Sequence, residues 1–172
     1  AITNLRAAID ETVLLAIWGN KGPVVVRWEE SSRPVATNVR AGWVMPLASS
    51  ATGLMFSAHL PAAMTAPLLK AEAQHRALKL DGHYARLAEI RTRGLARVKG
   101  DLQIGIAGIA APVFGQPGAI AAVIAALGPQ GAFDTSWDGP IARAVRSAAQ
   151  GLSRRIGFID APGGAVRARS TS

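Results

Sequence analysis

The sequence predicts an α+β domain in which helices flank a mainly antiparallel sheet. Two pairs of strand-like segments are each joined by a tight turn, and helix-like segments lie before, between and after these pairs. Short turns of this kind join antiparallel strands, whereas parallel strands need a long crossover connection. A dinucleotide-binding parallel fold would also need a glycine-rich turn between its first strand and helix, and the sequence has none there.

The first elements are a helix and a hairpin. Apolar residues recur at helical spacing over residues 2–9, which is compatible with a helix. The turn signal Gly19-Asn-Lys-Gly22 then separates two segments that are rich in strand-forming residues, 11–18 and 24–30. These segments predict a β-hairpin.

The segment after this hairpin is predicted to be less regular. Residues 33–40 indicate a short strand at an edge of the sheet, because Pro34 cannot donate a backbone hydrogen bond. Gly42 interrupts the segment before residues 43–47, and the end of that strand-like stretch turns into a helix.

Three helices are expected next. Ser49 and Ser50 are N-cap candidates for a helix that runs to about His59, since a serine oxygen can accept from amides two or three residues later. The other two helices are predicted over 65–78 and 83–92. In the second of these, the apolar residues face inward and the charged residues outward. The inward residues are Leu87 and Ile90, and the outward ones are Arg86, Glu89, Arg91 and Arg93.

A second hairpin and a last helix complete the predicted domain. Strands are expected over 95–98, 106–114 and 118–127, and Gly115-Gln-Pro-Gly118 is the turn between the last two. Pro140 marks the start of the last helix, because proline is tolerated in a first turn. Its apolar stripe is Ile141, Val145, Ala148, Leu152 and Ile156. The domain is predicted to span 1–160, followed by a mobile basic tail over 161–172.

Composition limits the class of protein. At 172 residues and 17.8 kDa, one compact domain is expected. Only 17% of the residues are charged while 49% are hydrophobic, which favours a surface that is partly covered by another subunit. The chain has no cysteine and no apolar run of about 20 residues, so we expect no disulfide, no membrane span and a cytoplasmic location. It begins at Ala1 without methionine, so it is expected to be a piece of a longer protein.

The net charge of +8 does not by itself indicate binding to nucleic acid. Six of the nineteen basic residues lie between Arg143 and Arg169, and five more lie between Arg86 and Lys99. Phe158 is the one aromatic residue within these two ranges of the sequence, so no platform for stacking bases is evident. Arginines on the outer face of a helix are most simply explained as solvated side chains.

No candidate for catalysis or metal binding emerges. The three histidines, His59, His75 and His83, have no spacing that suits a metal site, and surface or loop positions are expected for them. Ser49, Ser50 and Thr52 lack the surroundings of an activated nucleophile and are better explained as helix-capping residues. We therefore expect neither an enzyme nor a bound cofactor.

The small residues Ala51, Thr52 and Gly53 at the start of the first central helix allow two interpretations. They can let the helix pack close to the sheet. They can also leave room for a carboxylate or carbonyl oxygen against the free N–H groups of the helix start. The sequence pattern leaves both open.

Several motifs in this order resemble the C-terminal effector-binding domain of the IclR (isocitrate lyase regulator) family of bacterial transcription regulators. The motifs are Glu11-Thr-Val-Leu-Leu15, Arg40-Ala-Gly42, Met45-Pro-Leu-Ala-Ser-Ser-Ala-Thr-Gly53, Ile90-Arg-Thr-Arg-Gly-Leu95, Gly105-Ile-Ala-Gly-Ile-Ala-Ala-Pro-Val-Phe114 and Gly128-Pro129. The resemblance implies a GAF-like sheet with helices around it. It also implies a homodimer or homotetramer, and contact with operator DNA only through an N-terminal winged helix-turn-helix that is not present in this chain.

The resemblance also implies where a small-molecule effector binds. The positions it indicates are Met45, Leu47, Ala51, Thr52, Gly53, Val98, Ile106, Gly108, Ala125 and Leu127. Members that hold small keto acids carry polar residues at several of these positions, whereas this chain has Val98, Gly108, Ala125 and Leu127. We therefore expect a larger, more apolar effector, such as an aromatic or aliphatic acid. The alternative is a degenerate domain that serves only oligomerisation, with its pocket filled by its own side chains.

Overall fold

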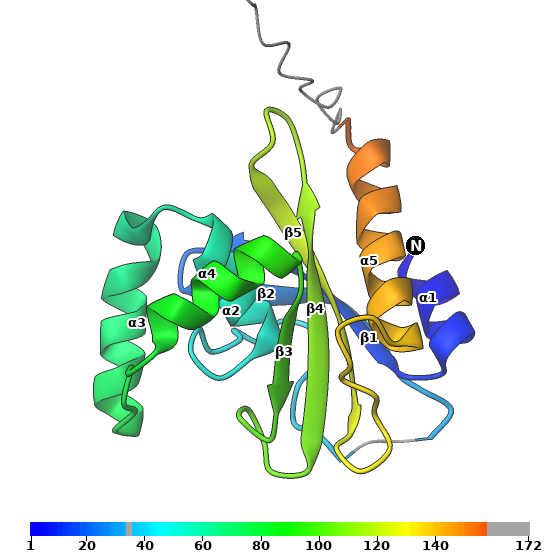
Figure 1. Cartoon of the computed structure of the whole chain (residues 1–172), viewed down its shortest axis with the longest axis horizontal. Helices are drawn as coiled ribbons and strands as arrows, with labels where there is room; N and C mark the ends of the chain where they lie inside the picture. The colour runs from blue at the N-terminus through cyan, green and yellow to red at the C-terminus, as the bar shows by residue number, and fades with distance from the viewer. Residues whose placement is uncertain (34–35, 158–172) are drawn as a thin grey trace, which may run out of the picture.

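A five-stranded antiparallel sheet with the order β2-β1-β5-β4-β3 forms the centre of the computed structural model, which describes residues 1–33 and 36–157 (Figure 1). The strands are β1 (Thr12–Gly19), β2 (Gly22–Glu29), β3 (Ala96–Lys99), β4 (Ile106–Phe114) and β5 (Ile120–Pro129). The helices are α1 (Ile2–Ile9), α2 (Ala51–His59), α3 (Ala62–Arg76), α4 (His83–Arg93) and α5 (Pro140–Arg155).

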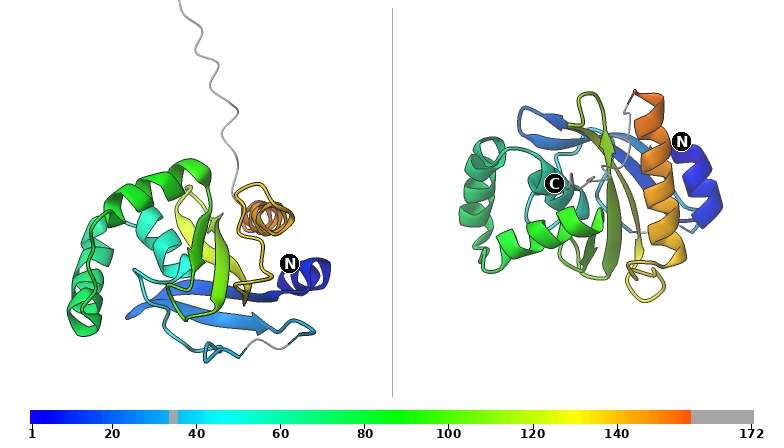
Figure 2. Two further views of the ribbon diagram at one scale, coloured as in Figure 1. Left: turned by 60° about the horizontal axis from the view of Figure 1, so that its bottom comes forward. Right: turned by 45° about the horizontal axis from the view of Figure 1, so that its top comes forward.

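Helices cover the sheet on both sides. α1 and α5 lie together on one face, while α2 and α4 pack against the other face and α3 lies outside them (Figures 1 and 2). Because both faces are covered, β4 and β5 are buried over most of their length. Their sequences accordingly contain nearly continuous apolar residues instead of an alternating pattern.

The start of α2 is fixed by two local features. Ser50 is the N-cap, and its hydroxyl oxygen accepts a hydrogen bond from the Gly53 amide at 2.8 Å. Gly53 allows the helix to approach the preceding turn very closely, because a Cβ atom there would lie 2.0 Å from the Pro46 carbonyl oxygen. The close-packing interpretation of this glycine is therefore sufficient to explain it.

The predicted fold class is confirmed, and the predicted helices and hairpins are present with boundaries that differ by a few residues. The turn at 115–118 also forms, with a Gly118 amide to Gly115 carbonyl hydrogen bond of 2.7 Å. The largest boundary difference among the helices is at α3, which begins at Ala62 instead of residue 65 because Pro61 provides its N-terminal cap position.

The predicted strand over 33–40 is wrong for residues 36–40, which are irregular; Pro34 lies outside the described residues. The 43–47 segment also forms no full strand. Instead, backbone hydrogen bonds connect residues 42–45 to the outer edge of β2, and a single bridge pairs Val44 with Val24. A turn at 40–43, closed by the Trp43 amide and the Arg40 carbonyl, prevents a longer ladder. The predicted tail over 161–172 lies outside the described residues.

Candidate functional site

A small cavity of about 20 Å³ lies between the start of α2 and the strands β3, β4 and β5. Its lining residues come from β1, the turn before α2, α2 itself, those three strands and the loop between β3 and β4. They are Leu14, Met45, Ser50, Ala51, Thr52, Val98, Leu102, Ile106, Ala107, Gly108, Ala125, Ala126 and Leu127. No charged side chain is among these lining residues, so the cavity is apolar apart from its serine and threonine.

The fold brings together eight of the ten residues at which a ligand was expected. The residues that line the cavity are Met45, Ala51, Thr52, Val98, Ile106, Gly108, Ala125 and Leu127. The other two, Leu47 and Gly53, do not line it. They meet each other instead, since a Cβ atom on Gly53 would lie 2.6 Å from the Leu47 Cα atom.

Hydrogen-bond donors remain at one end of this cavity. Within the described part of the chain, the Thr52 hydroxyl and the amides of Ala51 and Thr52 make no hydrogen bond, although Thr52 is only 1% exposed. The Gly53 amide, which was expected to be free as well, is already bonded to Ser50. The start of a helix attracts negative charge. This end of the cavity therefore suits a ligand oxygen.

The cavity is too small for a metabolite in this conformation. About 20 Å³ accommodates roughly one water molecule, whereas small-molecule pockets are typically about 300–1,000 Å³. Half-buried Leu102, in the loop that follows β3, contributes to the lining and packs against the core. Gly100 and Gly105, both with positive φ, lie at the two ends of this loop.

The turn before α2 carries a carboxylate that the sequence did not indicate. Glu72 of α3 accepts hydrogen bonds from the amides of Leu47 at 2.6 Å and Ala48 at 3.2 Å. Arg76 lies 3.9 Å from this carboxylate and donates to the Ser49 hydroxyl at 2.7 Å. An internal anion thus occupies amides in the turn just before the helix start at which an external anion was expected.

Two of the histidines are less exposed than expected. His83 is 7% exposed and His59 is half-buried, and the Nε2 atom of each has no hydrogen-bond partner within the described residues. Burial lowers the pKa of both, and the charges of Arg91 near His59 and Arg86 near His83 lower it further. Among the described residues there is no group of three or more histidine and carboxylate side chains that could hold a metal ion.

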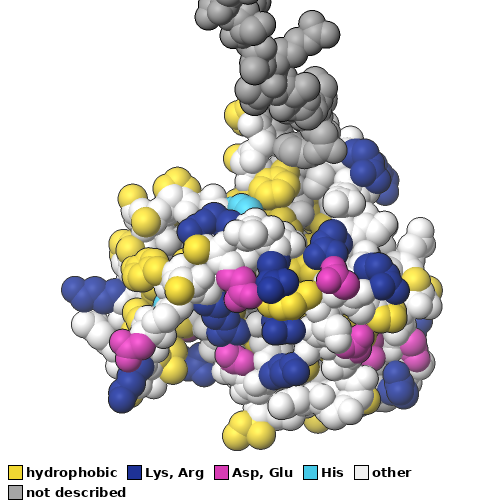
Figure 3. All heavy atoms as spheres, in the orientation of Figure 1, with side chains coloured by type: hydrophobic (Ala, Val, Ile, Leu, Met, Phe, Trp, Pro, Cys, Tyr) yellow, Lys and Arg dark blue, Asp and Glu magenta, His cyan; other side chains and the backbone are white. Residues whose placement is uncertain are grey.

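Lys and Arg side chains gather on the face of the molecule that carries α4 and α5 (Figure 3). Trp137 lies under the guanidinium groups of Arg93 and Arg97, which are 4.5 and 4.0 Å from its ring centroid. Trp137 lies about 40 positions from Arg93 and Arg97 in the sequence and meets them only in the folded protein.

Comparisons with known proteins identify the fold. The crystal structure of HmgR from Pseudomonas aeruginosa is 36% identical, covers 91% of this chain and 64% of its own, and has a TM-score of 0.83. The IclR protein of Thermotoga maritima is 21% identical, with coverages of 91% and 66% and a TM-score of 0.77. The transcriptional regulator YaiJ is 21% identical, with 91% of both chains covered and a TM-score of 0.81. At 21% identity, the similarity to the Thermotoga maritima protein and to YaiJ shows a shared fold and nothing more.

This chain spans only about two thirds of HmgR, 64% of its length. None of the curated proteins matches it in sequence. Within the described residues, every helix is too short or too polar to cross a membrane. The sequence model described as the C-terminal domain of the bacterial transcriptional regulator IclR matches residues 1–154. The chain therefore belongs to the IclR family of bacterial transcriptional regulators, of which it carries the C-terminal domain.

Proposed function

We propose that this chain is the effector-sensing and oligomerisation domain of a bacterial DNA-binding transcription regulator that acts in the cytoplasm. The supporting observation is the cavity beside Thr52, where residues from the turn before α2, from α2 and from three strands meet. Operator DNA is contacted by a winged helix-turn-helix outside this chain, and the full protein assembles as a homodimer or homotetramer.

The effector in this proposal is an aromatic or aliphatic acid. Its hydrocarbon part packs against the apolar lining, which includes Val98, Ala125 and Leu127. Its carboxylate binds the Thr52 hydroxyl and the amides at the start of α2, where the helix dipole favours an anion. A very small keto acid would leave most of the apolar lining without a partner.

Binding requires the cavity to expand from about 20 Å³. A ligand can drive this change only if it binds the expanded form more tightly than the closed one, and the cost of expansion lowers its apparent affinity. In the regulator, the same difference in affinity would favour one arrangement of the subunits over another, which is how a signal would reach the DNA-binding domains.

Calorimetry and thermal unfolding with phenylacetate, hexanoate and glyoxylate test this function. Phenylacetate or hexanoate should bind, and at 100 times its dissociation constant should stabilise the fold by about 2.7 kcal/mol. Glyoxylate should bind more weakly than either. If glyoxylate binds most tightly, the effector class is wrong.

A matched pair of variants on α2 tests the site. Thr52→Val keeps the shape of the side chain but removes the hydroxyl from the cavity, so it should weaken binding about tenfold with a nearly unchanged melting temperature. Ser57→Ala is the control. Ser57 is also buried in α2 and its hydroxyl is unpaired within the described residues, but it does not line the cavity.

The second candidate function is assembly without a ligand, and the near-closure of the cavity favours it. In that case no acid would raise the melting temperature. Neither Thr52→Val nor Ser57→Ala would then change the response of the melting temperature to any of the three acids.

A further inference from the structure

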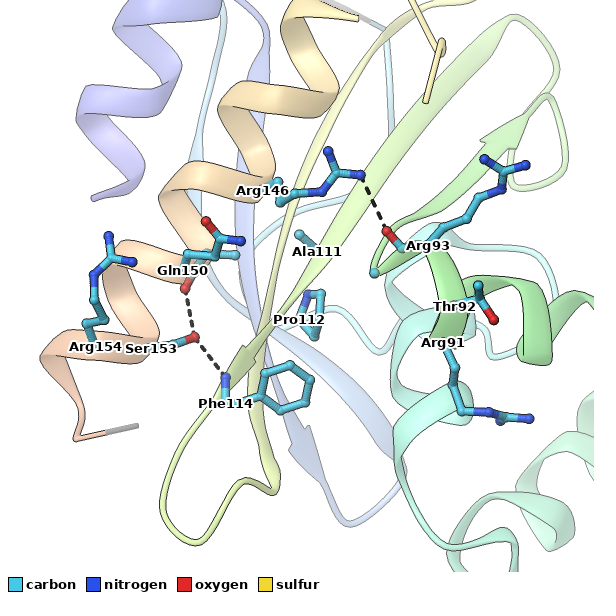
Figure 4. Close-up of a pocket in the computed structure, with 12 residues that line it drawn as sticks. Arg91, Thr92, Arg93, Ala111, Pro112, Phe114, Arg146, Gln150, Ser153 and Arg154 are labelled. Atoms are coloured by element: carbon cyan, nitrogen blue, oxygen red, sulfur yellow. Dashed lines mark hydrogen bonds between the residues drawn. The ribbon is translucent and has the colours of Figure 1, made fainter. Parts of the chain in front are cut away.

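A larger cleft, distinct from the cavity beside Thr52, lies between the C-terminal end of α4, the helix α5 and the outer edge of β4 (Figure 4). Its volume is about 450 Å³, within the usual range for small-molecule sites. No residue lines both this cleft and the cavity beside Thr52.

The floor of the cleft exists because β3 is shorter than β4. β3 pairs with β4 only as far as Ala110, so among the described strands none pairs with Ala111 or Pro112 on that edge, and β4 continues past them to Phe114. Pro112 has no amide hydrogen, and the Phe114 amide donates to the Ser153 hydroxyl of α5 at 3.0 Å. A further β-strand would find few free donors here, so the edge is suited to a ligand and not to strand addition.

The walls of the cleft are strongly basic. Four arginines line it and no carboxylate does: Arg91, Arg93, Arg146 and Arg154. Arg93 is paired with Glu89 at 2.9 Å, and Arg146 lies 4.0 Å from the highly exposed Asp138. Arg91 and Arg154 form no ion pair within the described part of the chain. Charges of one sign around a concave surface attract a ligand of the opposite sign.

Polar side chains from α4 and α5 surround the floor of the cleft (Figure 4). Arg146 reaches across from α5 and donates a hydrogen bond to the Arg93 carbonyl at 3.4 Å (Figure 4). Its other N–H groups make no hydrogen bond to the described residues and can donate to a ligand. Gln150 projects from α5 beside it, and Arg91 and Arg154 lie at the two sides. An anionic group near Arg146 would leave the apolar part of the same ligand over Pro112 and Phe114.

We propose that this cleft binds a small organic anion, with a phosphate or carboxylate group beside Arg146 and an apolar ring or chain on the floor formed by Ala111, Pro112 and Phe114. The concave shape and apolar floor favour this ligand over a nucleic-acid backbone, which needs only an exposed row of cations. Trp137, which contacts Arg93 and Arg97, does not line the cleft.

The test uses phenyl phosphate as the probe, with inorganic phosphate and phenol as comparisons, titrated into the 172-residue chain at constant ionic strength. Calorimetry should show phenyl phosphate binding at least about tenfold more tightly than phosphate or phenol. Amide chemical shifts should change at Ala111 and Gln150. Tightest binding of free phosphate would overturn the role of the apolar floor.

Arg146→Ala and Arg154→Ala should each weaken phenyl phosphate binding about tenfold, because each removes a charged donor. Arg155→Ala is the matched control: it removes the same charge from an exposed neighbour on α5 that does not line the cleft. Thr52→Val should not change this binding, so failure of the effector site and failure of this site can be told apart.

Equal losses in Arg154→Ala and Arg155→Ala would mean general attraction to a basic surface and would refute the proposal. The same holds if a short DNA duplex of arbitrary sequence binds this face while phenyl phosphate does not. Chemical shift changes confined to residues around Thr52 would also overturn it, since the probe would then occupy the other cavity.

Discussion

The carboxylate of Glu72 accepts a hydrogen bond from the backbone amide of Leu47 at 2.6 Å, and a second from the next amide at 3.2 Å. The two residues lie 25 positions apart, and the Glu72 side chain is only 12% exposed. α3 buries few of its own side chains, Thr65 and Leu69. This carboxylate therefore supplies a large share of what holds α3 to the turn before α2.

Glu72→Gln should destabilise the fold by about 1–2 kcal/mol. The amide side chain keeps the shape but loses the charge that strengthens both hydrogen bonds, and its NH₂ group opposes one of the backbone amides. Urea unfolding measures the change. Glu89→Gln is the control, because the exposed Glu89–Arg93 pair one turn apart should contribute about 0.5 kcal/mol or less. Equal effects of the two changes would show that Glu72 does not anchor α3.

Local sequence patterns predicted those helices and strands that are determined by neighbouring residues, such as turn residues and helix caps. Both hairpins follow from their turn residues, and the start of α2 follows from Ser50, whose hydroxyl accepts from an amide three residues later. Residues 43–47 form no full strand, because a turn at 40–43 and a few hydrogen bonds to β2 replace the ladder that the strand-like pattern predicts. Such contacts depend on the tertiary structure and leave no periodic signal.

The sequence predicted where the candidate site lies but not how small its cavity is. Eight expected residues meet at one cavity, because the family motifs identify the strands and the helix start that converge there. The volume of about 20 Å³ depends on how Leu102 and its loop pack, which no motif encodes. Glu72 was missed for a similar reason, since its partners are backbone amides far along the chain.

Leu102→Ala should open the cavity beside Thr52. Leu102 lines the cavity and is half-buried, so its truncation enlarges the space and costs about 1–2 kcal/mol of stability. Phenylacetate should bind more tightly to this variant than to the native chain, because less expansion is needed. Ile104→Ala, at a 94% exposed position in the same loop, should change neither quantity. Weaker binding to Leu102→Ala in calorimetry would indicate that this side chain contacts the ligand and does not block it.

Stability should decrease as the pH falls from about 7.5 to 5.5. Burial is the main cause that lowers the pKa of His59 and His83 in the folded chain, and the charges of Arg91 and Arg86 lower these pKa values further. At His83, the charge of Glu72 raises the pKa and so opposes part of this effect. The unfolded chain then binds more protons below its histidine pKa of about 6.5, so the stabilisation is complete above that pH and is lost on the acid side. Urea unfolding at several pH values should show this slope, and His83→Gln should reduce it. A stability that rises between pH 7.5 and 5.5 would contradict the assignment.

Gly53→Ala should severely destabilise the fold, whereas Gly151→Ala should not. An added Cβ at Gly53 would lie 2.0 Å from the Pro46 carbonyl oxygen and 2.6 Å from the Leu47 Cα, so α2 would have to move away from the turn. Forced repacking of this kind costs about 3 kcal/mol or more. At Gly151 in α5 the nearest atom is an Arg154 nitrogen at 4.0 Å, and alanine should stabilise the helix by about 0.5–1 kcal/mol. Thermal and urea unfolding of both variants measure the contrast. Native stability of Gly53→Ala would mean that the turn and α2 can separate at little cost, and the small residues at the helix start would then need the ligand-binding explanation instead.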